Sequence, residues 1–281
     1  MLVRILSGAV LMAILIPSLF LSATPVFDIL ITVACVMACY EMLNCLGFKK
    51  VWKISLPSFL IAAFIPLCVR QVIDVGVGMA ELILLVFIVY LFILLSIAVF
   101  SHGKYSIQDV SSVFVLIFYI VFGFMAILSV RNISVDDKGK YLYLLIFISA
   151  WVTDTGAYFT GVLFGKHKLI PDVSPKKTVE GAIGGLFFCV ASFVIFGLIM
   201  KHFYGYTPNY IILCVLGLVL AVVSMCGDLV ASLVKRQYNI KDYSKLIPGH
   251  GGIMDRFDSL IATASVLSVV LNLPFILQNI L

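Results

Sequence analysis

Residues 80–100 read AELILLVFIVYLFILLSIAVF, a run in which Glu81 is the only charged side chain. A helix needs about 20 mostly apolar residues to cross the hydrocarbon core of a bilayer, so this stretch predicts a membrane span. The whole chain has a similar character, since 63% of its 281 residues are hydrophobic and only 12% are charged. A typical soluble domain carries about 25% charged residues. The composition therefore excludes a water-soluble globular fold, and it excludes disorder because disordered chains are poor in apolar residues.

Other stretches of similar length and apolarity extend the prediction to about nine transmembrane helices. They cover residues 5–22, 27–47, 54–69, 80–100, 110–130, 141–165, 181–204, 209–232 and 257–280. The first is too long for the apolar part of a cleaved signal peptide, so we interpret it as an uncleaved span. The alternating pattern of a membrane β-barrel is absent, and no strand is predicted. We expect an all-α polytopic bundle.

The distribution of basic residues predicts the orientation of the spans. If successive loops alternate between the two sides, most of the 19 Lys and Arg residues fall on one side. Loops rich in Lys and Arg are cytoplasmic, so the N-terminus is expected in the cytoplasm. The net charge of +5 is spread over short loops rather than one basic stripe, so no nucleic acid is expected as a partner. We expect a multi-pass protein of the inner (cytoplasmic) membrane, and the short chain favours a bacterial source.

Two of the predicted cytoplasmic loops differ from the short connectors. Residues 165–181 and 233–256 combine charged side chains with Gly and Pro, which indicates defined turns rather than helix. We therefore divide the chain by function. Residues 1–140 are expected to form a scaffold with dimer and lipid contacts, and residues 141–281 are expected to hold the catalytic region with both loops.

Acidic residues inside predicted spans are the first candidates for a functional site, because a charge within the bilayer is costly. Asp154 lies mid-span among small and hydroxyl residues and is expected to line a polar pocket. Asp228, Ser232 and Lys235 follow an i, i+4, i+7 spacing, which places them on one helix face. Glu41 lies toward the cytoplasmic end of its span, where it either pairs with a basic group or lines a cavity.

The second loop and its flanks carry the residue types of a metal and phosphate site. Asp255 and Asp258 lie three residues apart where the last span begins, and with Asp228 they provide carboxylates of the kind that hold Mg²⁺. Lys and Arg bind phosphate oxygens, and Gly251 and Gly252 allow backbone N–H groups to approach an anion. This combination fits a polyphosphate substrate. No P-loop and no Gly-x-Ser-x-Gly elbow is present in the sequence.

The same residues carry a resemblance to a known family. Ser232-Leu-Val-Lys-Arg236, Lys241-Asp-Tyr-Ser244 and Ile247-Pro-Gly-His-Gly-Gly-Ile-Met-Asp-Arg-Phe-Asp258 together resemble the signature of the phosphatidate cytidylyltransferase (CDP-diacylglycerol synthase) family. The block from Ser174 to Gly181 is also similar to that family, although position 179 is often aromatic there and is Val here. These motifs cover about residues 150–260. The first 140 residues resemble the family only in being apolar spans.

The resemblance implies a reaction in which CTP and phosphatidate (phosphatidic acid) give CDP-diacylglycerol and pyrophosphate. It also implies an all-helical membrane fold, a homodimer, and a site centred on Mg²⁺ that holds a second cation such as K⁺. The family's metal-ligand roles fall on Asp228 and Asp255, and we add Asp258 as a second ligand or a close neighbour of the metal.

The chemistry of this reaction agrees with the residues present. The attacking oxygen belongs to a phosphate monoester that is already ionised near neutral pH, so no strong general base is required. Charge neutralisation and in-line positioning are required instead. We expect four basic side chains to bind phosphates: Lys235, Arg236, Lys241 and Arg256. We expect His250 to bind phosphate or to donate a proton. We expect a further group of residues to bind substrate, namely Asp154, Tyr158, Ser174, Lys176, Lys177, Thr178, Glu180, Ser232, Gly251 and Gly252.

Three alternatives remain beside this interpretation. A CTP-dependent polyprenol kinase shares features with the family but transfers the γ-phosphate to a lipid alcohol. An ion-coupled secondary transporter would use Asp154 but would place little constraint on the loops. A CDP-alcohol phosphotransferase would carry an Asp-Gly…Ala-Arg…Gly…Asp…Asp pattern, which the sequence lacks. The complete signature favours cytidylyl transfer.

Overall fold

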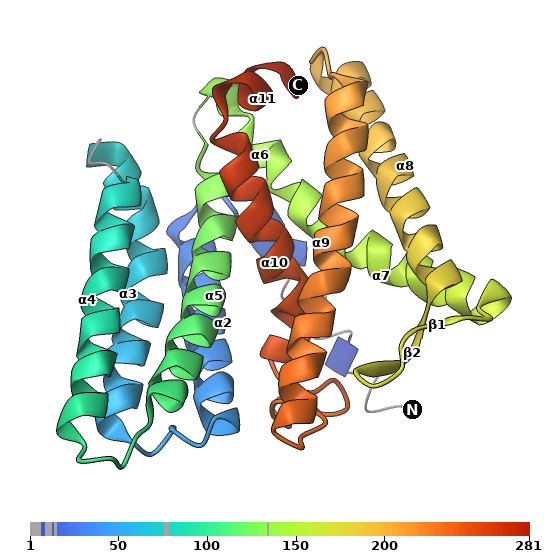
Figure 1. Ribbon diagram of the computed structural model, residues 1–281. Helices are drawn as coiled ribbons and strands as arrows, with labels where there is room; N and C mark the ends of the chain where they lie inside the picture. The colour runs from blue at the N-terminus through green and yellow to red at the C-terminus, as the bar shows by residue number, and fades with distance from the viewer. Residues whose placement is uncertain (1–6, 9–12, 14–15, 76–78, 134) are drawn as a thin grey trace. The chain divides into compact units, whose positions relative to one another are not determined.

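The computed structural model describes the chain apart from residues 1–6, 9–12, 14–15, 76–78 and 134 (Figure 1). Its elements form two compact units. The first unit contains Met1–Asn132 and Gln237–Phe257, and the second contains Ile133–Arg236 and Asp258–Leu281. These units differ from the functional regions 1–140 and 141–281, because Gln237–Phe257 groups with the early helices. The functional division itself stays a prediction.

Four long helices build the first unit and lie side by side in Figure 1. They are α2 (Pro25–Cys45), α3 (Trp52–Val75), α4 (Met79–Phe100) and α5 (Ile107–Arg131). Helix α3 contacts α2, α4 and α5, and α2 also packs against α5. A capping box holds the start of α5, where the Ser106 hydroxyl accepts from the Asp109 N–H and the Asp109 carboxylate accepts from the Ser106 N–H. Loop 46–51 joins α2 to α3 and loop 101–106 joins α4 to α5. Because successive helices run in opposite directions, the two loops lie at the same end of this unit.

The second unit contains the remaining helices and a small hairpin. Its elements are η1 (Val135–Asp137), α6 (Gly139–Leu142), α7 (Leu144–Phe164), β1 (Lys168–Ile170), β2 (Ser174–Thr178), α8 (Val179–Tyr204), α9 (Tyr210–Gln237), α10 (Met254–Leu271) and α11 (Pro274–Asn279). The last residue of α9 and the first turn of α10 group with the first unit. Helices α7 and α8 approach closely, because a Cβ on Gly184 would overlap the side chain of Thr160 and one on Gly185 would contact the Thr153 carbonyl.

The structure confirms the all-α polytopic membrane class. Seven helices among the described residues are long and apolar enough to cross a membrane. They are Pro25–Cys45, Trp52–Val69, Glu81–Phe100, Ile107–Arg131, Gly139–Phe164, Val179–Tyr204 and Tyr210–Gln237, and they coincide with the predicted spans from 27–47 to 209–232. The first predicted span, 5–22, lies partly outside the described residues. The total of nine helices and the cytoplasmic N-terminus stay predictions.

The predicted span 257–280 is wrong as a single helix. Helix α10 ends at Leu271, and α11 begins anew at Pro274. Proline has no N–H to continue the helical ladder, and its ring disfavours helical conformation in the residue before it. The buried Lys138 ammonium lies 3.4 Å from the carbonyls of both Leu277 and Gln278, so a charged donor interacts with the end of the chain.

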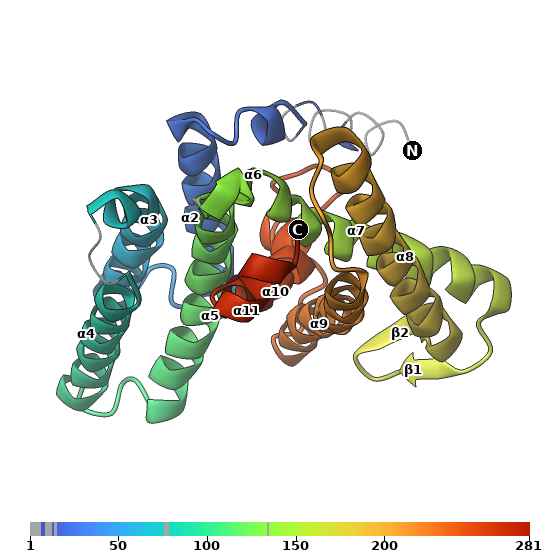
Figure 2. The ribbon, with the colours of Figure 1, turned by 90° about the horizontal axis from the view of Figure 1, so that it is seen from above.

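The expectation that the chain contains no strand is also wrong. Strands β1 and β2 form an antiparallel hairpin in which Lys168 pairs with Thr178 and Ile170 pairs with Ser174. Figure 2 shows this hairpin beside the start of α8. The turn between the strands includes Pro171, so the turn expected from the Gly and Pro residues of this loop is confirmed there. Strands this short leave too few residues for an alternating pattern to be recognised.

Candidate active site

The predicted catalytic loop is shorter in the structure than in the sequence analysis. Lys235 and Arg236 lie in the last turn of α9, where basic side chains interact favourably with the helix dipole. Asp255 and Arg256 lie in the first turn of α10. The residues between the two helices, 238–253, form the connecting loop, and Lys241 is exposed there. Burial raises the pKa of Tyr238 at the start of this loop, where its hydroxyl also interacts with Ser112 of α5.

Asp255 organises the end of this loop. Its Oδ2 atom accepts hydrogen bonds from the backbone N–H of Tyr243, at 2.9 Å, and of Gly252, at 3.0 Å. Asp255 is 9% exposed, and Tyr243 is buried beside it. A buried carboxylate that accepts two backbone N–H bonds is held in one orientation. Two backbone N–H groups of the loop therefore bind Asp255, the acid that the sequence analysis predicted as a metal ligand.

Glu41 of α2 holds the same loop from the other side. Its Oε1 accepts from the Ser244 hydroxyl at 2.6 Å and from the Ile253 N–H at 3.0 Å, and its Oε2 accepts from the Met254 N–H at 2.8 Å. Glu41 is 2% exposed. These donors include N–H groups at the beginning of α10, which have no partner within the helix. The carboxylate therefore fixes both the loop and the helix that starts with Asp255.

The glycines and the histidine of the signature have structural roles in this loop. The Gly251 φ angle of 84° lies in the left-handed region that favours glycine. A Cβ on Gly252 would overlap the Glu41 carboxylate, so a larger residue there would displace that carboxylate from its position. The Gly252 N–H, which was expected to face a substrate anion, donates to Asp255. The His250 Nδ1 lies 2.7 Å from the Ser7 hydroxyl, so an N-terminal residue contacts the signature.

A second group of predicted residues comes together within the second unit. The Lys177 ammonium lies 2.6 Å from Oδ2 of Asp228, and the Ser232 hydroxyl lies 3.4 Å from Oδ1 of the same residue. Electrostatic interactions also connect Asp258 with Asp228, Lys235 and Asp154. Both motif blocks, 174–181 and 228–236, therefore contribute to one charged cluster.

The hairpin explains how Lys177 reaches this cluster. Successive side chains of a strand point to opposite faces, so Lys177 of β2 points away from Lys176 and Thr178. Lys176 is exposed, whereas Lys177 is partly buried against Asp228. The turn that leads into β2 also lies close to α9, since the Arg236 Nε is 3.4 Å from the Val173 carbonyl.

Thr178 and Glu180 fix the junction between β2 and α8. The Thr178 hydroxyl accepts from the Gly181 N–H and caps α8. The Glu180 carboxylate accepts from the N–H groups of Lys166 and His167 and pairs with the His167 ring at 2.6 Å. Their predicted contact with substrate is untested, and their observed contacts support the hairpin.

Asp154 and Tyr158 lie on an exposed face of α7. Tyr158 is 66% exposed, and Asp154 is exposed as well while it interacts electrostatically with Asp258. Ser174 at the start of β2 is half-buried. The structure thus keeps Asp154 near the cluster.

The carboxylates fit Mg²⁺ by their chemistry. Mg²⁺ takes oxygen ligands and is usually held by one or two carboxylates, with waters and substrate phosphates filling the shell. Asp228 and Asp258 interact within one unit and satisfy that requirement. In the described parts of the chain, no group of three or more His, Cys, Asp or Glu side chains is arranged to bind a metal by itself. Substrate oxygens would therefore have to complete the coordination.

Glu41 is the residue that the sequence analysis did not place in the site. Its depth in an apolar span was the signal, and the alternatives were a basic partner or a cavity wall. The structure gives it a hydroxyl and two backbone N–H groups as partners, and it also lines a small cavity together with Tyr40, Phe59 and Ser244. No local pattern in the sequence indicates those partners.

Replacing Lys176 with alanine is expected to raise the KM for CTP or phosphatidate several-fold. Lys176 is exposed on β2 and points away from the neighbouring Lys177, so its loss removes a cation that meets phosphates arriving from solvent and leaves the Lys177–Asp228 pair intact. Steady-state kinetics in mixed micelles measure the effect, with Glu81→Ala at an exposed position of α4 as the control. Equal effects of the two substitutions would make the hairpin a mere connector.

Comparison with known proteins shows the family of the chain. Residues 2–274 match the model of the cytidylyltransferase family. The chain is 34% identical over 270 residues to a phosphatidate cytidylyltransferase of Staphylococcus haemolyticus, covering 96% of this chain and 98% of that protein. A phosphatidate cytidylyltransferase of Staphylococcus aureus is 40% identical over 180 residues, covering 64% of this chain and 66% of that protein. Because the family model matches nearly the whole chain and a relative is 34% identical over 96% of it, this chain belongs to the cytidylyltransferase family.

Proposed function

We propose that this chain is a CTP:phosphatidate cytidylyltransferase that transfers the cytidylyl group of CTP to phosphatidate, forming CDP-diacylglycerol and pyrophosphate in phospholipid biosynthesis. The observation that carries the proposal is the 2.6 Å pair between Lys177 and Asp228. It joins two motif blocks that are separated in the sequence and that both resemble the same enzyme family. The staphylococcal relatives are named phosphatidate cytidylyltransferases, and this name supports the same reaction for the chain.

The bond changes of this reaction define what the site must do. An oxygen of the phosphatidate monoester attacks the α-phosphorus of CTP, a P–O bond forms there, and the bond to pyrophosphate breaks. The nucleophile is already an anion, so the protein's main task is to bring two anions together and to stabilise the leaving group. Cationic side chains around the carboxylate cluster suit that task.

Each group of residues has a proposed role in this reaction. Asp228 and Asp255 hold Mg²⁺, with Asp258 as a further ligand or neighbour. Bound Mg²⁺ neutralises phosphate charge and stabilises the pyrophosphate leaving group. Lys235, Arg236, Lys241 and Arg256 bind phosphates, and Lys177 holds Asp228 in place until substrate binds. Support for these roles comes from the carboxylate chemistry and from the ordered loop around Asp255.

The proposal includes the setting of the enzyme. The loops that carry the signature face the cytoplasm, where CTP is available, and phosphatidate stays in the leaflet while its headgroup enters the site. The chain is a multi-pass protein of the inner membrane and acts as a homodimer. A second cation such as K⁺ shares the site. The excess of Lys and Arg in alternate loops supports the sidedness.

The proposal is tested by the fate of the α-phosphate of CTP. Purified protein in mixed micelles is incubated with α-³²P-CTP and phosphatidate, with and without Mg²⁺. We expect a labelled lipid only when both substrates and Mg²⁺ are present. Absence of labelled lipid from folded protein would contradict the transferase assignment, and labelled lipid without Mg²⁺ would contradict the metal. Lipid alcohols with γ-labelled CTP form the kinase arm, which is expected to give no product.

A further inference from the structure

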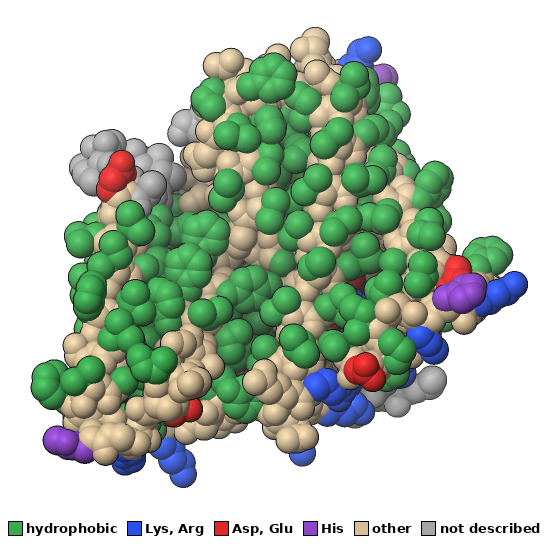
Figure 3. All heavy atoms as spheres, viewed as in Figure 1, with side chains coloured by type: hydrophobic (Ala, Val, Ile, Leu, Met, Phe, Trp, Pro, Cys, Tyr) green, Lys and Arg blue, Asp and Glu red, His purple; other side chains and the backbone are tan. Residues whose placement is uncertain are grey.

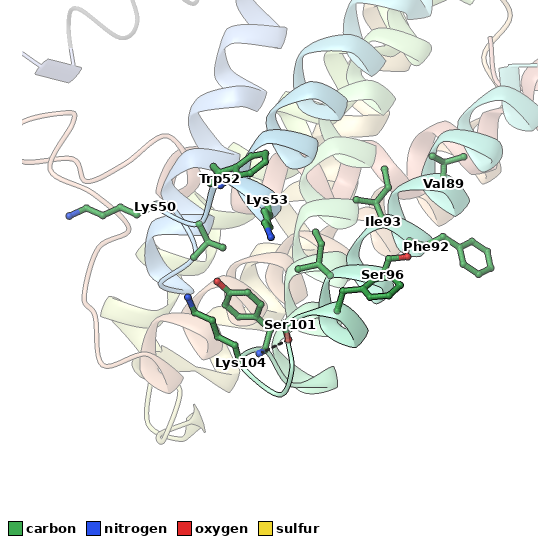
Figure 4. A pocket seen from close by; sticks show the side chains of 13 residues that line it. Lys50, Trp52, Lys53, Val89, Phe92, Ile93, Ser96, Ser101 and Lys104 are labelled. Carbon is green, nitrogen blue, oxygen red and sulfur yellow. Dashed lines mark hydrogen bonds between the residues drawn. The ribbon is translucent and has the colours of Figure 1, made fainter.

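A large pocket in the first unit is lined by none of the residues assigned to the reaction. It has a volume of about 860 Å³ and lies between α3, α4 and the loop that follows α4 (Figure 4). Its lining includes Lys50 from the loop before α3, Trp52 and Lys53 from the first turn of α3, and Lys104 from the loop after α4. Among the described side chains that line it, none is acidic, so the pocket is positively charged.

The other wall of the pocket is an apolar stripe along α4. Val89, Phe92, Ile93 and Phe100 line it and are between 39% and 78% exposed. Their spacing, with Ser96 and Ile97, places them on one face of the helix. Figure 3 shows apolar side chains along α4 and Lys or Arg side chains near its lower end. The stripe from residue 89 to residue 100 extends about 16 Å, close to the roughly 15 Å depth of one leaflet's hydrocarbon.

We propose that this pocket binds a phospholipid with an anionic phosphate-monoester headgroup, of the phosphatidate type, with its phosphate on Lys53 and Lys104 and an acyl chain along α4. Figure 4 shows these two lysines coming from two different elements, while Lys50 extends away from the other side chains. Basic side chains near a membrane surface attract anionic lipids. A monoester carries up to two negative charges, which suits more than one lysine.

The lining argues against other occupants. A zwitterionic lipid would bring an ammonium group, and no acidic side chain among the lining residues would accept it. A second copy of this chain would bring the same lysines to the contact, because a two-fold interface uses one patch on both subunits. Trp52, which is 68% exposed, sits where the lysines meet the apolar wall, as tryptophan does at the membrane interface.

Tryptophan fluorescence tests the binding without any catalysis. The chain has two tryptophans, so Trp151→Phe leaves Trp52 as the only tryptophan, and excitation at 295 nm avoids the tyrosines. The protein is placed in phosphatidylcholine vesicles that contain phosphatidate with brominated acyl chains, which quench nearby tryptophan. We expect brominated phosphatidate to quench Trp52 more than brominated phosphatidylcholine at equal mole fraction. Each of Lys53→Gln and Lys104→Gln should lower the relative affinity about fivefold.

Two controls separate this site from general charge attraction. Lys49→Gln removes a lysine of the loop before α3 that does not line the pocket. This substitution should leave the quenching preference unchanged. Equal quenching by brominated phosphatidate and brominated phosphatidylglycerol would overturn the monoester preference, and equal quenching by all three lipids would overturn the site. Phosphatidate is also the substrate under the proposed function. The quenching reports binding near Trp52 and needs no turnover, so failure of cytidylyl transfer would leave the quenching result unaffected.

Discussion

Asp255→Asn is expected to lower turnover roughly 10³-fold while the protein stays folded. Asparagine keeps an oxygen that accepts from the N–H groups of Tyr243 and Gly252, so the loop retains its hydrogen bonds. The substitution removes the negative charge, which a metal ligand requires. We therefore expect the chemical step to be lost and the architecture to remain.

The measurement compares formation of labelled lipid from α-³²P-CTP by the variant and by the unmodified protein. Size-exclusion chromatography and thermal unfolding in detergent show whether the variant is folded. Asp255→Ala provides a second comparison, because it leaves two buried N–H groups without an acceptor and should also lower the unfolding temperature. Near-normal turnover by Asp255→Asn would remove Asp255 from the metal site.

Glu41→Ala is expected to abolish most activity and to destabilise the protein by about 3–5 kcal/mol. The substitution removes the acceptor for the Ser244 hydroxyl and for the N–H groups of Ile253 and Met254. Glu41 is a positioning residue in this view, since it touches the loop rather than the substrate. The loop that carries Asp255 would lose its anchor on α2, so kcat should fall by at least 100-fold.

Conservative variants distinguish positioning from simple loss of fold. Glu41→Gln keeps one accepting oxygen and should recover part of kcat, whereas Glu41→Asp has a shorter side chain and should recover less. Activity is expressed per folded molecule, measured by the unfolding signal at the assay temperature. A purely structural role predicts normal kcat for each folded molecule of every variant. That result would contradict the positioning role of Glu41.

The sequence alone predicted the membrane spans, from the long apolar stretches, and the enzyme family, from the charged motifs. Membrane spans depend on the hydropathy of about 20 consecutive residues, which is a local property, so the ranges from 27–47 to 209–232 correspond to helices in the structure. The break before Pro274 carried a local signal as well, although the predicted span ran through it. The short hairpin at Lys168–Ile170 and Ser174–Thr178 gave too little pattern to be recognised.

The partners of the buried acids were decided only by the tertiary structure. Glu41 bonds to residues more than 200 positions away along the chain, and Lys177 pairs with Asp228 of a different helix. The sequence showed that Glu41 and Asp228 were costly to place in a membrane and therefore needed partners. Which donor each acid receives depends on how α2 packs against the signature loop in one unit and how β2 packs near α9 in the other, and packing of distant segments leaves no local pattern in the sequence. The chain thus specified its spans and its chemistry by composition and motif, whereas the folded contacts alone determined how the signature loop is held.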